Sequence, residues 1–400
     1  MKTLIAVDAH LYRTPDNRIW AKTIYDYDFW KRYLEIFSDI VVLSRIEDVD
    51  YKFVENFLPS SGEKVEFQSV PMARSGSQYL FNLPLFIKNI IEISKIADCA
   101  IIRLPSVTSF FTELIFSMFN KPYVIEVVAD PYSVYKENKF TKFLMTKHLK
   151  KACKRANGVS YVTQHSLQEF FPSRSKILGC ESEVYFESYY SSIKLSEKFF
   201  FFNRNFDKID QQVNLIHTAN NINNYIKGHD TVIKIIKKLT EHGINAKITF
   251  IGDGKKKEEF INLSKELGIY ELINFTGFIS SKEEIRKLLI DADIFVFPTH
   301  AEGLPRAIIE AMAVGLPCIS TPVNGIPELL PDEFLFKPND IEGFTNKIIE
   351  LISNKRKLNE VSKANIEKAK EYQEKFLQNR RNIFFKKLQN LTKLEMRHEN

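Results

Sequence analysis

The amino-acid sequence predicts an α/β protein with two parallel sheets, each covered by helices. Short apolar runs of strand length alternate with segments of helical period along most of the chain, and this alternation is typical of parallel sheets. The chain has 400 residues, 44% of them hydrophobic, which is enough for more than one core. A segment rich in Tyr, Ser and Phe, residues 181–210, interrupts the alternation. We therefore expect two domains that are joined there.

Nine apolar runs mark the expected strands. Five precede the interruption: TLIAV (3–7), DIVVLS (39–44), CAIIRL (99–104), YVIEVV (123–128) and GVSYVT (158–163). Four follow it: NLIHTA (214–219), AKITFIG (246–252), DIFVFP (293–298) and PCIST (317–321). One intervening helix is clear, because apolar residues recur at i, i+3, i+4 and i+7, at Val232, Ile235, Ile236 and Leu239. The lysine-rich chain after about residue 355 is also expected to be helical.

Composition argues against several classes of protein. The net charge of +6 comes from 56 basic and 50 acidic residues, a balance that does not indicate a nucleic-acid-binding protein. The four cysteines form no C-x-x-C pair, so we expect neither a zinc site nor a disulfide framework. The first apolar run is too short for an export signal, and charges interrupt the longest apolar stretch, 101–119. We expect a protein of the reducing cytoplasm.

Two glutamates follow the predicted strand 293–298. Glu302 lies in a tight loop, and Glu310 lies in the helix that begins near Pro305 and ends at Gly315. Ligands of open parallel sheets bind at the carboxyl ends of strands, where the start of a helix also attracts anions. The two carboxylates could therefore accept hydrogen bonds from the hydroxyls of a nucleotide sugar. Alternatively, Glu302 caps the helix and Glu310 pairs with Arg306 on a solvated face.

Four segments of the second half occur in a characteristic order: YIKGHDTVIKIIKKL (225–239), FIGDGKKKEEF (250–260), NFTGFIS (274–280) and HAEGLPRAIIEAMAVGLPCISTPVNGIPEL (300–329). Together they resemble the donor-binding half of family 4 glycosyltransferases, of the group 1 type. These are retaining sugar-transfer enzymes with the GT-B fold. The resemblance implies two Rossmann-like α/β/α domains that face a cleft, with a C-terminal helix crossing back to the first domain.

The resemblance also implies roles for residues of the second half. Glu302 would contact the donor sugar, and Glu310 would hold the ribose of the nucleotide. Lys227 would neutralise the diphosphate, but the arginine with which it works in the family is replaced by Asn220 and Asn221. The donor would also be contacted by the start of the helix and by the loop that lies under the nucleobase, namely Gly303, Leu304, Pro305, Arg306, Phe278 and Ile279.

No metal is expected at this site. The triplet Asp291-Ala292-Asp293 has the D-x-D spacing of metal-dependent transferases, but it opens a strand, where the family tends to have acidic residues for structural reasons. The GDG segment 252–254 has neither the G-x-G-x-x-G spacing nor a Walker lysine followed by Ser or Thr, and it is interpreted as a turn near the pocket. The only small molecule that we expect is the nucleotide-diphosphate sugar, so no cofactor is predicted.

The first half resembles the family less closely, because the loop expected after its first strand, 8–22, contains no glycine. His10 and Arg13 in this loop are candidates for acceptor binding, and so is Arg103 at the end of a later strand. Asp130 is a candidate catalytic residue that points at the acceptor or at the transferred sugar. The alternatives are a polar loop histidine, a structural ion pair for Arg103 and a turn aspartate before Pro131 for Asp130.

The segment 136–155 contains eight lysines and arginines against one glutamate, with aromatic and aliphatic residues interleaved. This composition fits a helix that lies on an anionic membrane. It also fits a helix that packs on the sheet and turns its lysines to water. Nucleic acid is not an expected partner, since no base-stacking or groove-reading motif accompanies the segment.

We thus predict a GT-B enzyme with an acceptor domain (1–205), a donor domain (206–380) and a helical tail (381–400). It would be a retaining, metal-independent transferase of the hexosyltransferase type, and its acceptor would be a glycan or a lipid-linked sugar. The commonest setting of such bacterial enzymes is cell-surface polysaccharide or lipopolysaccharide biosynthesis. The protein would lie free in the cytoplasm or at the inner face of the cytoplasmic membrane. The alternative is a non-catalytic protein that binds a nucleotide sugar or a partner.

Overall fold

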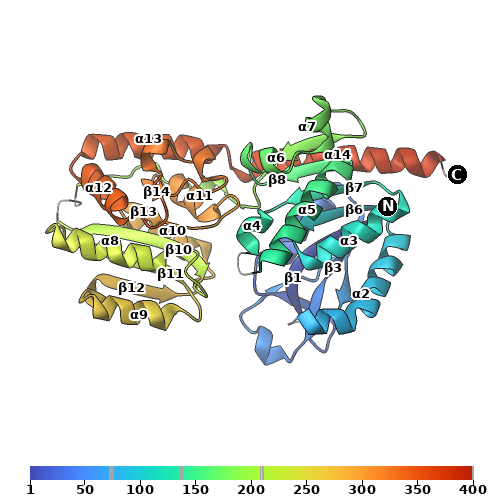
Figure 1. Ribbon diagram of the computed structural model, residues 1–400, viewed down its shortest axis with the longest axis horizontal. Coiled ribbons are helices and arrows are strands. Elements are labelled where there is room, and N and C mark those ends of the chain that lie inside the picture. Colours follow the sequence, from blue (N-terminus) through green and yellow to red (C-terminus); the bar gives the residue numbers. More distant parts are fainter. Residues whose placement is uncertain (72–75, 136–137, 208, 210, 399–400) are drawn as a thin grey trace. The chain divides into compact units, whose positions relative to one another are not determined.

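The computed structural model describes residues 1–71, 76–135, 138–207, 209 and 211–398 (Figure 1). Its contacts divide the chain into two compact units. Unit 1 comprises Met1–Tyr190 and Gln378–Asn400, and unit 2 comprises Ser191–Leu377. Each unit contains one sheet that is mainly parallel. Both predicted α/β units are therefore present.

Unit 1 alternates strands and helices along the chain. Its elements are β1 (Lys2–Arg13), β2 (Ile19–Ala21), α1 (Tyr27–Leu34), β3 (Asp39–Asp48), β4 (Leu58–Pro59), β5 (Val65–Val70), α2 (Gly76–Ile96), β6 (Cys99–Leu104), α3 (Val107–Phe116), β7 (Tyr123–Val127), α4 (Pro131–Val134), α5 (Lys139–Arg155), β8 (Gly158–Tyr161), α6 (Ser166–Phe170), α7 (Arg174–Leu178), β9 (Phe186–Tyr189) and most of α14 (Glu374–His398). All five strands predicted for the first half are present.

The parallel part of the unit 1 sheet has the order β5-β3-β1-β6-β7-β8-β9. Strands β5 and β9 were not predicted. The burial of β5 is low and irregular, and β9 lies inside the segment that was expected to be a connection. Both are edge strands, so their neighbours on one side, rather than an apolar run, define them.

Strand β1 is longer than the sequence predicted. After a bulge between Ala6 and His10 it continues to pair with β3, and its last residues add the antiparallel strand β2. The expectation of a loop directly after the first strand was therefore wrong. His10 and Arg13 lie within β1, and the turn comes later, at Asn17, which has a φ of 62°.

A buried carboxylate lies at the centre of unit 1. Glu126 of β7 forms an ion pair with Arg103 of β6, and the hydroxyls of Tyr33 and Tyr190 each donate to it at 3.0 Å. Burial favours the neutral carboxyl, but the charges of Arg103 and of Arg381 in α14 outweigh this effect, so the pKa of Glu126 lies below its usual range. Glu126 thus links the sheet, α1 and the C-terminal helix.

Helix α14 returns to unit 1, as predicted. Its amino end is bonded to unit 2, where the backbone N–H of Glu374 donates to the carbonyl of Leu195. From Gln378 onwards it belongs to unit 1. There Phe385 is buried, and its ring centroid lies 5.2 Å from that of Tyr33. The apolar side chains of α14 therefore complete the core of unit 1.

Unit 2 has a smaller sheet. Its elements are β10 (Val213–Asn221), α8 (His229–Glu241), β11 (Ala246–Asp253), α9 (Lys257–Glu266), β12 (Ile273–Gly277), α10 (Lys282–Asp291), β13 (Ile294–Phe297), α11 (Arg306–Ala313), β14 (Cys318–Ser320), α12 (Ile341–Ile352) and α13 (Lys355–Lys370). The strand order is β12-β11-β10-β13-β14, and every pair is parallel. The periodic helix is α8, whose four predicted core residues are fully buried.

The segment 191–205, which the sequence analysis placed in the first domain, packs with unit 2. Arg204 donates to the carbonyls of Val314 and Leu289 at 3.0 and 2.8 Å, and it also donates to that of Ala292. Arg286 of α10 donates to the carbonyl of Phe199 at 2.8 Å. These bonds satisfy carbonyl groups at the ends of helices, which is why the segment is fixed to this unit.

Two histidines are buried side by side in unit 2. The ring centroids of His217 in β10 and His229 in α8 are 4.5 Å apart. His217 Nδ1 lies 2.9 Å from the carbonyl of Val296, while neither ring nitrogen of His229 has a hydrogen-bond partner among the described residues. Burial lowers the pKa of His217 to about 4 and that of His229 to about 2. Both imidazoles are therefore neutral at pH 7.

None of the described helices has both the length and the apolar composition that a membrane span requires.

Replacing Glu126 by Gln should lower the free energy of unfolding by about 3–5 kcal/mol at neutral pH, because Arg103 would stay buried without its counter-charge. The difference should shrink as pH falls through the lowered pKa of Glu126, since the wild-type carboxyl then also becomes neutral. Urea unfolding curves at several pH values measure both effects. Glu66→Gln, at an exposed ion pair with Lys2, should change stability by less than about 1 kcal/mol.

The depressed pKa values of the two histidines predict a loss of stability in acid. Unfolding lets both imidazoles bind protons, so their contribution is complete above a pH of about 6.5 and is lost as the pH falls towards the folded-state values. In His229→Phe, the pH dependence of the unfolding free energy below about pH 6 should be weaker by roughly 1.4 kcal/mol per pH unit. An unchanged slope in denaturant titrations would contradict this assignment.

Candidate functional site

The candidate site of unit 2 lies where the strand order reverses. The chain proceeds from β10 to β11 and β12 on one side, and then crosses back to place β13 and β14 on the other side of β10. Ligands of open parallel sheets bind outside the carboxyl ends of the strands at such a reversal. Lys227 lies in the loop that follows β10 and Glu302 in the loop that follows β13.

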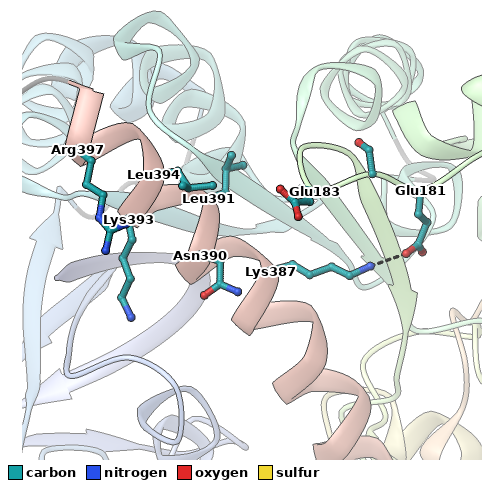
Figure 2. A pocket seen from close by; sticks show the side chains of 9 residues that line it. Glu181, Glu183, Lys387, Asn390, Leu391, Lys393, Leu394 and Arg397 are labelled. Carbon is teal, nitrogen blue, oxygen red and sulfur yellow. Dashed lines mark hydrogen bonds and ion pairs between the residues drawn. The ribbon is translucent and has the colours of Figure 1, made fainter.

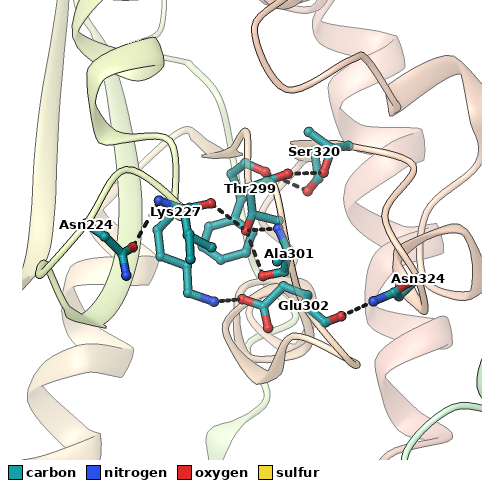
Figure 3. Close-up of polar contacts among 10 residues, drawn as sticks. Asn224, Lys227, Thr299, Ala301, Glu302, Ser320 and Asn324 are labelled. Carbon is teal, nitrogen blue, oxygen red and sulfur yellow. Dashed lines mark hydrogen bonds and ion pairs between the residues drawn. The ribbon is translucent and has the colours of Figure 1, made fainter. Parts of the chain in front are cut away.

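Lys227 and Glu302 point toward each other at the carboxyl ends of these strands (Figure 3). Lys227 Nζ donates to Glu302 Oε1. The side chains are 27% and 16% exposed, so the pair is accessible to a ligand but partly withdrawn from water. An ion pair in such surroundings is stronger than one on an open surface. The structure thus brings together two residues that the sequence separates by 75 positions.

Gly228 lets the two loops approach. Its φ is 74°, and a Cβ atom at this position would lie 2.3 Å from the carbonyl oxygen of Pro298. Two hydrogen bonds across the same contact end on the carbonyl of Ile226: one from the N–H of His300 at 2.8 Å and one from the hydroxyl of Thr299 at 3.1 Å. The two loops therefore form one rigid support under the ion pair.

The loop after β14 holds Glu302 from the other side. The side-chain amide of Asn324 donates to the carbonyl of Glu302, and the N–H of Gly325 donates to the carbonyl of Gly303 at 3.0 Å. The hydroxyl of Thr321 donates to the carbonyl of Thr299 at 2.8 Å. None of Asn324, Thr299 and Thr321 was among the predicted site residues. Asn324 could have been found, because it belongs to the NGIPEL segment of the family pattern.

Helix α11 begins directly after this loop. Pro305 is its N-cap residue and Arg306 its first residue. Gly303, Leu304 and Pro305 are buried, whereas Arg306 is partly exposed. Because the first N–H groups of a helix lack partners within it, and because the helix dipole is positive there, this end of α11 favours an anion.

Glu310 lies one helical turn further along α11. It is partly buried, and desolvation raises the pKa of its carboxyl, against the charges of Arg306 and Lys282. No ion pair between Glu310 and Arg306 is present within the described residues. Glu302 does not cap α11 with its side chain either, since the capping position is that of Pro305. Neither carboxylate therefore makes the contact that the purely structural alternative assigned to it.

Other predicted donor residues lie at the same edge of the sheet. Asn220 and Asn221 are exposed at the end of β10. After β12, the ring of Phe278 is 50% exposed, while Ile279 is buried. The GDG segment forms the end of β11 and a turn, where a Cβ atom on Gly252 would lie 1.8 Å from the carbonyl oxygen of Ala219. This glycine is needed for the close approach of β10 and β11.

The aspartates of the D-x-D triplet lie at the opposite edge. Asp291 ends α10, and Asp293 precedes β13, where its carboxylate accepts from the N–H of Asn214 at 2.7 Å. Asp293 therefore fixes the start of two strands, which is a structural role. Within the parts of the chain that the structure describes, no three His, Cys, Asp or Glu side chains gather as metal ligands do.

The predicted residues of unit 1 mostly have partners within the protein. His10 Nε2 lies 2.7 Å from Glu47 Oε2, and Arg13 forms two bonds with Asp48, at 2.6 and 3.1 Å. Arg103 is buried against Glu126, which is the structural ion pair that was considered as its alternative.

Asp130 is the N-cap residue of α4, and its carboxylate accepts from the N–H of Tyr132 at 2.9 Å. Burial raises its pKa. It lies at the carboxyl end of β7, as expected, and its capping bond is the turn contact that was the structural alternative for Asp130.

A hollow of about 770 Å³ lies elsewhere in unit 1, between the end of α14 and the segment before β9. Lys387, Lys393 and Arg397 line it together with Glu181, to which Lys387 is paired (Figure 2). Because residues 181–183 precede β9, the hollow adjoins the amino end of this strand. Ligands of open parallel sheets bind at the other end, so we do not assign the hollow to the candidate site.

Comparison with known proteins supports the interpretation of unit 2. Residues 200–371 match the family of glycosyl transferases group 1. The crystal structure of HepE from Anabaena in complex with UDP resembles the chain with a TM-score of 0.65 and 16% sequence identity, covering 95% of this chain and 98% of that one. This likeness establishes the GT-B fold.

Two relatives extend the comparison. The chain is 33% identical over 109 residues, 26% of its length and 27% of the relative's, to the UDP-Gal:alpha-D-GlcNAc-diphosphoundecaprenol alpha-1,3-galactosyltransferase of Escherichia coli. It is 31% identical over 337 residues, 83% of its length and 82% of the relative's, to protein CapJ of Staphylococcus aureus. With this family match over residues 200–371 and a relative that spans most of both chains, the protein belongs to the glycosyl transferases of group 1.

Proposed function

We propose that the protein is a retaining, metal-independent glycosyltransferase of family 4. It moves a hexose from a nucleotide-diphosphate sugar to a glycan or to a lipid-linked sugar. The observation that carries the proposal is the accessible Lys227–Glu302 pair at the point where the strand order of unit 2 reverses. A cation for the diphosphate and a carboxylate for the sugar hydroxyls lie together there, beside the amino end of α11.

The donor is assigned by the chemistry of these groups. The diphosphate lies against Lys227 and the start of α11, where Arg306 adds a second positive charge in place of the arginine that Asn220 and Asn221 replace. The hydroxyls of the ribose donate hydrogen bonds to the carboxylate of Glu310, and the base stacks on or near Phe278. The complex of HepE with UDP supports a uridine nucleotide as the first candidate.

The reaction requires stabilisation of a leaving group. The bond between the anomeric carbon and the diphosphate breaks, and the acceptor oxygen forms its new bond on the same face of the sugar. The departing phosphate oxygen takes the proton of the acceptor hydroxyl. Negative charge grows on the diphosphate during this step, and Lys227, already held in place by Glu302, is preorganised to stabilise it. Neither a flanking pair of carboxylates nor a metal ion takes part.

The acceptor belongs to bacterial cell-surface polysaccharide or lipopolysaccharide biosynthesis in this proposal. Support comes from the E. coli relative, whose name specifies a sugar on diphosphoundecaprenol as its acceptor. Asp130, His10 and Arg13 are the candidate residues for the acceptor. The protein lies in the cytoplasm or at the inner face of the cytoplasmic membrane, and residues 138–155 form the membrane contact. Residues 136 and 137 of the predicted contact lie outside the described residues.

The alternative is a non-catalytic protein that binds a nucleotide sugar. It is favoured by the lack of a glycine-rich loop after the first strand and by the replacement of the arginine by Asn220 and Asn221. Turnover decides between the two functions, because a non-catalytic protein would bind the donor without consuming it.

A nucleotide that binds the candidate site should stabilise the protein. At about 100 times its dissociation constant, UDP or another matching nucleoside diphosphate should add roughly 2.7 kcal/mol, visible as a rise in the melting temperature. Glu310→Gln should weaken binding about tenfold or more, since a hydrogen bond to a charged acceptor is lost. Affinity for wild type should also fall as the pH approaches the raised pKa of Glu310. The matched variant Glu266→Gln, at the exposed end of α9, should bind normally.

Lys227→Gln should lower kcat for donor cleavage about 100-fold to 1,000-fold, because it removes a charge aimed at the leaving group. Release of nucleoside diphosphate from UDP-sugars and GDP-sugars, with and without acceptor extracts, measures this. Lys234→Gln, on the exposed face of α8 next to Asp230, is the control and should keep full activity. Equal activity of wild type and Lys227→Gln would exclude the leaving-group role, and donor binding without turnover in wild type would favour the non-catalytic alternative.

A further inference from the structure

Helix α5 has two apolar faces, of which unit 1 covers only one. Met145, Leu149 and Cys153 are buried against the rest of the unit. Near the amino end of the helix, Phe140 and Phe143 are 75% and 65% exposed, and Leu144 is 39% exposed. These three side chains share one face, because they lie at i, i+3 and i+4.

Helix α4 adds to the uncovered face. Tyr132 and Val134 are 60% and 50% exposed. α4 contacts α5 directly (Figure 1), and Lys142 Nζ of α5 lies 3.6 Å from the ring centroid of Tyr132. The five exposed side chains thus lie on two adjoining helices, and they are called the apolar edge: Tyr132, Val134, Phe140, Phe143 and Leu144.

Positive charge surrounds the apolar edge. The segment 138–155 contains seven lysines and arginines and no Asp or Glu. Lys139, Lys147 and Lys150 are exposed, and Lys147 Nζ lies 5.8 Å from the ring centroid of Phe143. Aromatic and aliphatic side chains among lysines match the interface of an anionic bilayer, where rings insert below the headgroups and ammonium groups contact the phosphates.

The apolar edge begins at the edge of the sheet where acceptors are expected. Asp130 at the carboxyl end of β7 caps α4, and Tyr132 follows two residues later. A sugar carried on a membrane lipid would therefore lie close to the carboxyl ends of the unit 1 strands when the apolar edge is inserted.

We propose that the apolar edge inserts into anionic membranes and that this docking selects an acceptor anchored in the bilayer. The apolar edge identifies the residues that make the membrane contact of the proposed function. Membrane binding itself does not depend on the proposed function, whereas the choice of acceptor rests on it. A helix that merely turned its lysines to water would not need exposed Phe140 and Phe143 on the same face. The partner is a lipid bilayer with anionic headgroups.

Sedimentation of the full chain with vesicles tests the proposal. Wild type should bind vesicles that contain phosphatidylglycerol and should bind pure phosphatidylcholine vesicles at least about tenfold more weakly. The double variant Phe140→Ser/Phe143→Ser should lose at least about tenfold in binding to the anionic vesicles. Its melting temperature should equal that of wild type, since both rings are exposed.

A matched control separates the apolar edge from exposed apolar surface in general. Met118 and Phe376 are 79% and 47% exposed on other elements, so Met118→Ser/Phe376→Ser should bind vesicles like wild type. Loss of binding in both double variants, or in neither, would overturn the proposal. A third outcome would also overturn the proposal: wild type forms dimers in the absence of vesicles, and Phe140→Ser/Phe143→Ser is monomeric. The apolar edge would then bind a second copy of the chain.

Nucleotide binding distinguishes this proposal from the proposed function. Phe140→Ser/Phe143→Ser should bind UDP or the matching nucleotide as wild type does, because the two residues belong to unit 1 and the donor residues to unit 2. Vesicle binding without any nucleotide binding would refute the donor site and leave the docking surface in place. Nucleotide binding without vesicle binding would refute the docking surface alone.

Discussion

The lack of a β-carbon at Gly228 is the constraint on which the candidate site depends. The parallel strands β10 and β13 end at the same edge of the sheet, but strand order alone does not bring their loops into contact. With any other residue, a Cβ atom would press on the carbonyl oxygen of Pro298 at 2.3 Å. The loops can close only with glycine, and their closure places Lys227 against Glu302. The bonds from Thr299, His300 and Asn324 then fix the loops around this pair.

The charged pairs of the protein differ in how much water reaches them, and this difference separates a structural pair from a candidate ligand-binding pair. Arg103 and Glu126 are 9% and 4% exposed, and the hydroxyls of Tyr33 and Tyr190 both donate to the carboxylate of Glu126. A ligand cannot replace either partner without leaving a buried charge. Lys227 and Glu302 remain accessible, so an anion can compete for the ammonium group at a much lower cost. This difference in exposure supports the ligand-binding role that we propose for Lys227 and Glu302, and the structural role of Arg103 and Glu126.

Helix α5 shows how one element serves both stability and surface chemistry. Its buried face fills the core of unit 1, and Arg155 and His148 both pair with the buried carboxylate of Glu113. The first turns extend the apolar character to a second face, where Phe140 and Phe143 are largely exposed. Exposed rings of this size carry an unfavourable hydration free energy unless a partner covers them.

The architecture and the segments that form the candidate site could be predicted from the sequence, because both are recorded in short patterns. Apolar runs such as CAIIRL and DIFVFP are long enough to identify buried strands, and the 3.6-residue period of Val232 to Leu239 identifies α8. The spacing of Glu302 and Glu310 is also a local pattern that can be read from the sequence.

The length of β1, the edge strands β5 and β9, and the position of residues 191–205 depend on neighbours far away in the chain. The same holds for Arg103, whose partner Glu126 lies on another strand, and for Lys227, whose partner lies 75 residues away. Local patterns reflect contacts within about one helical turn or one strand. The contacts that a residue makes with a distant charge, strand edge or loop are decided only by the tertiary structure.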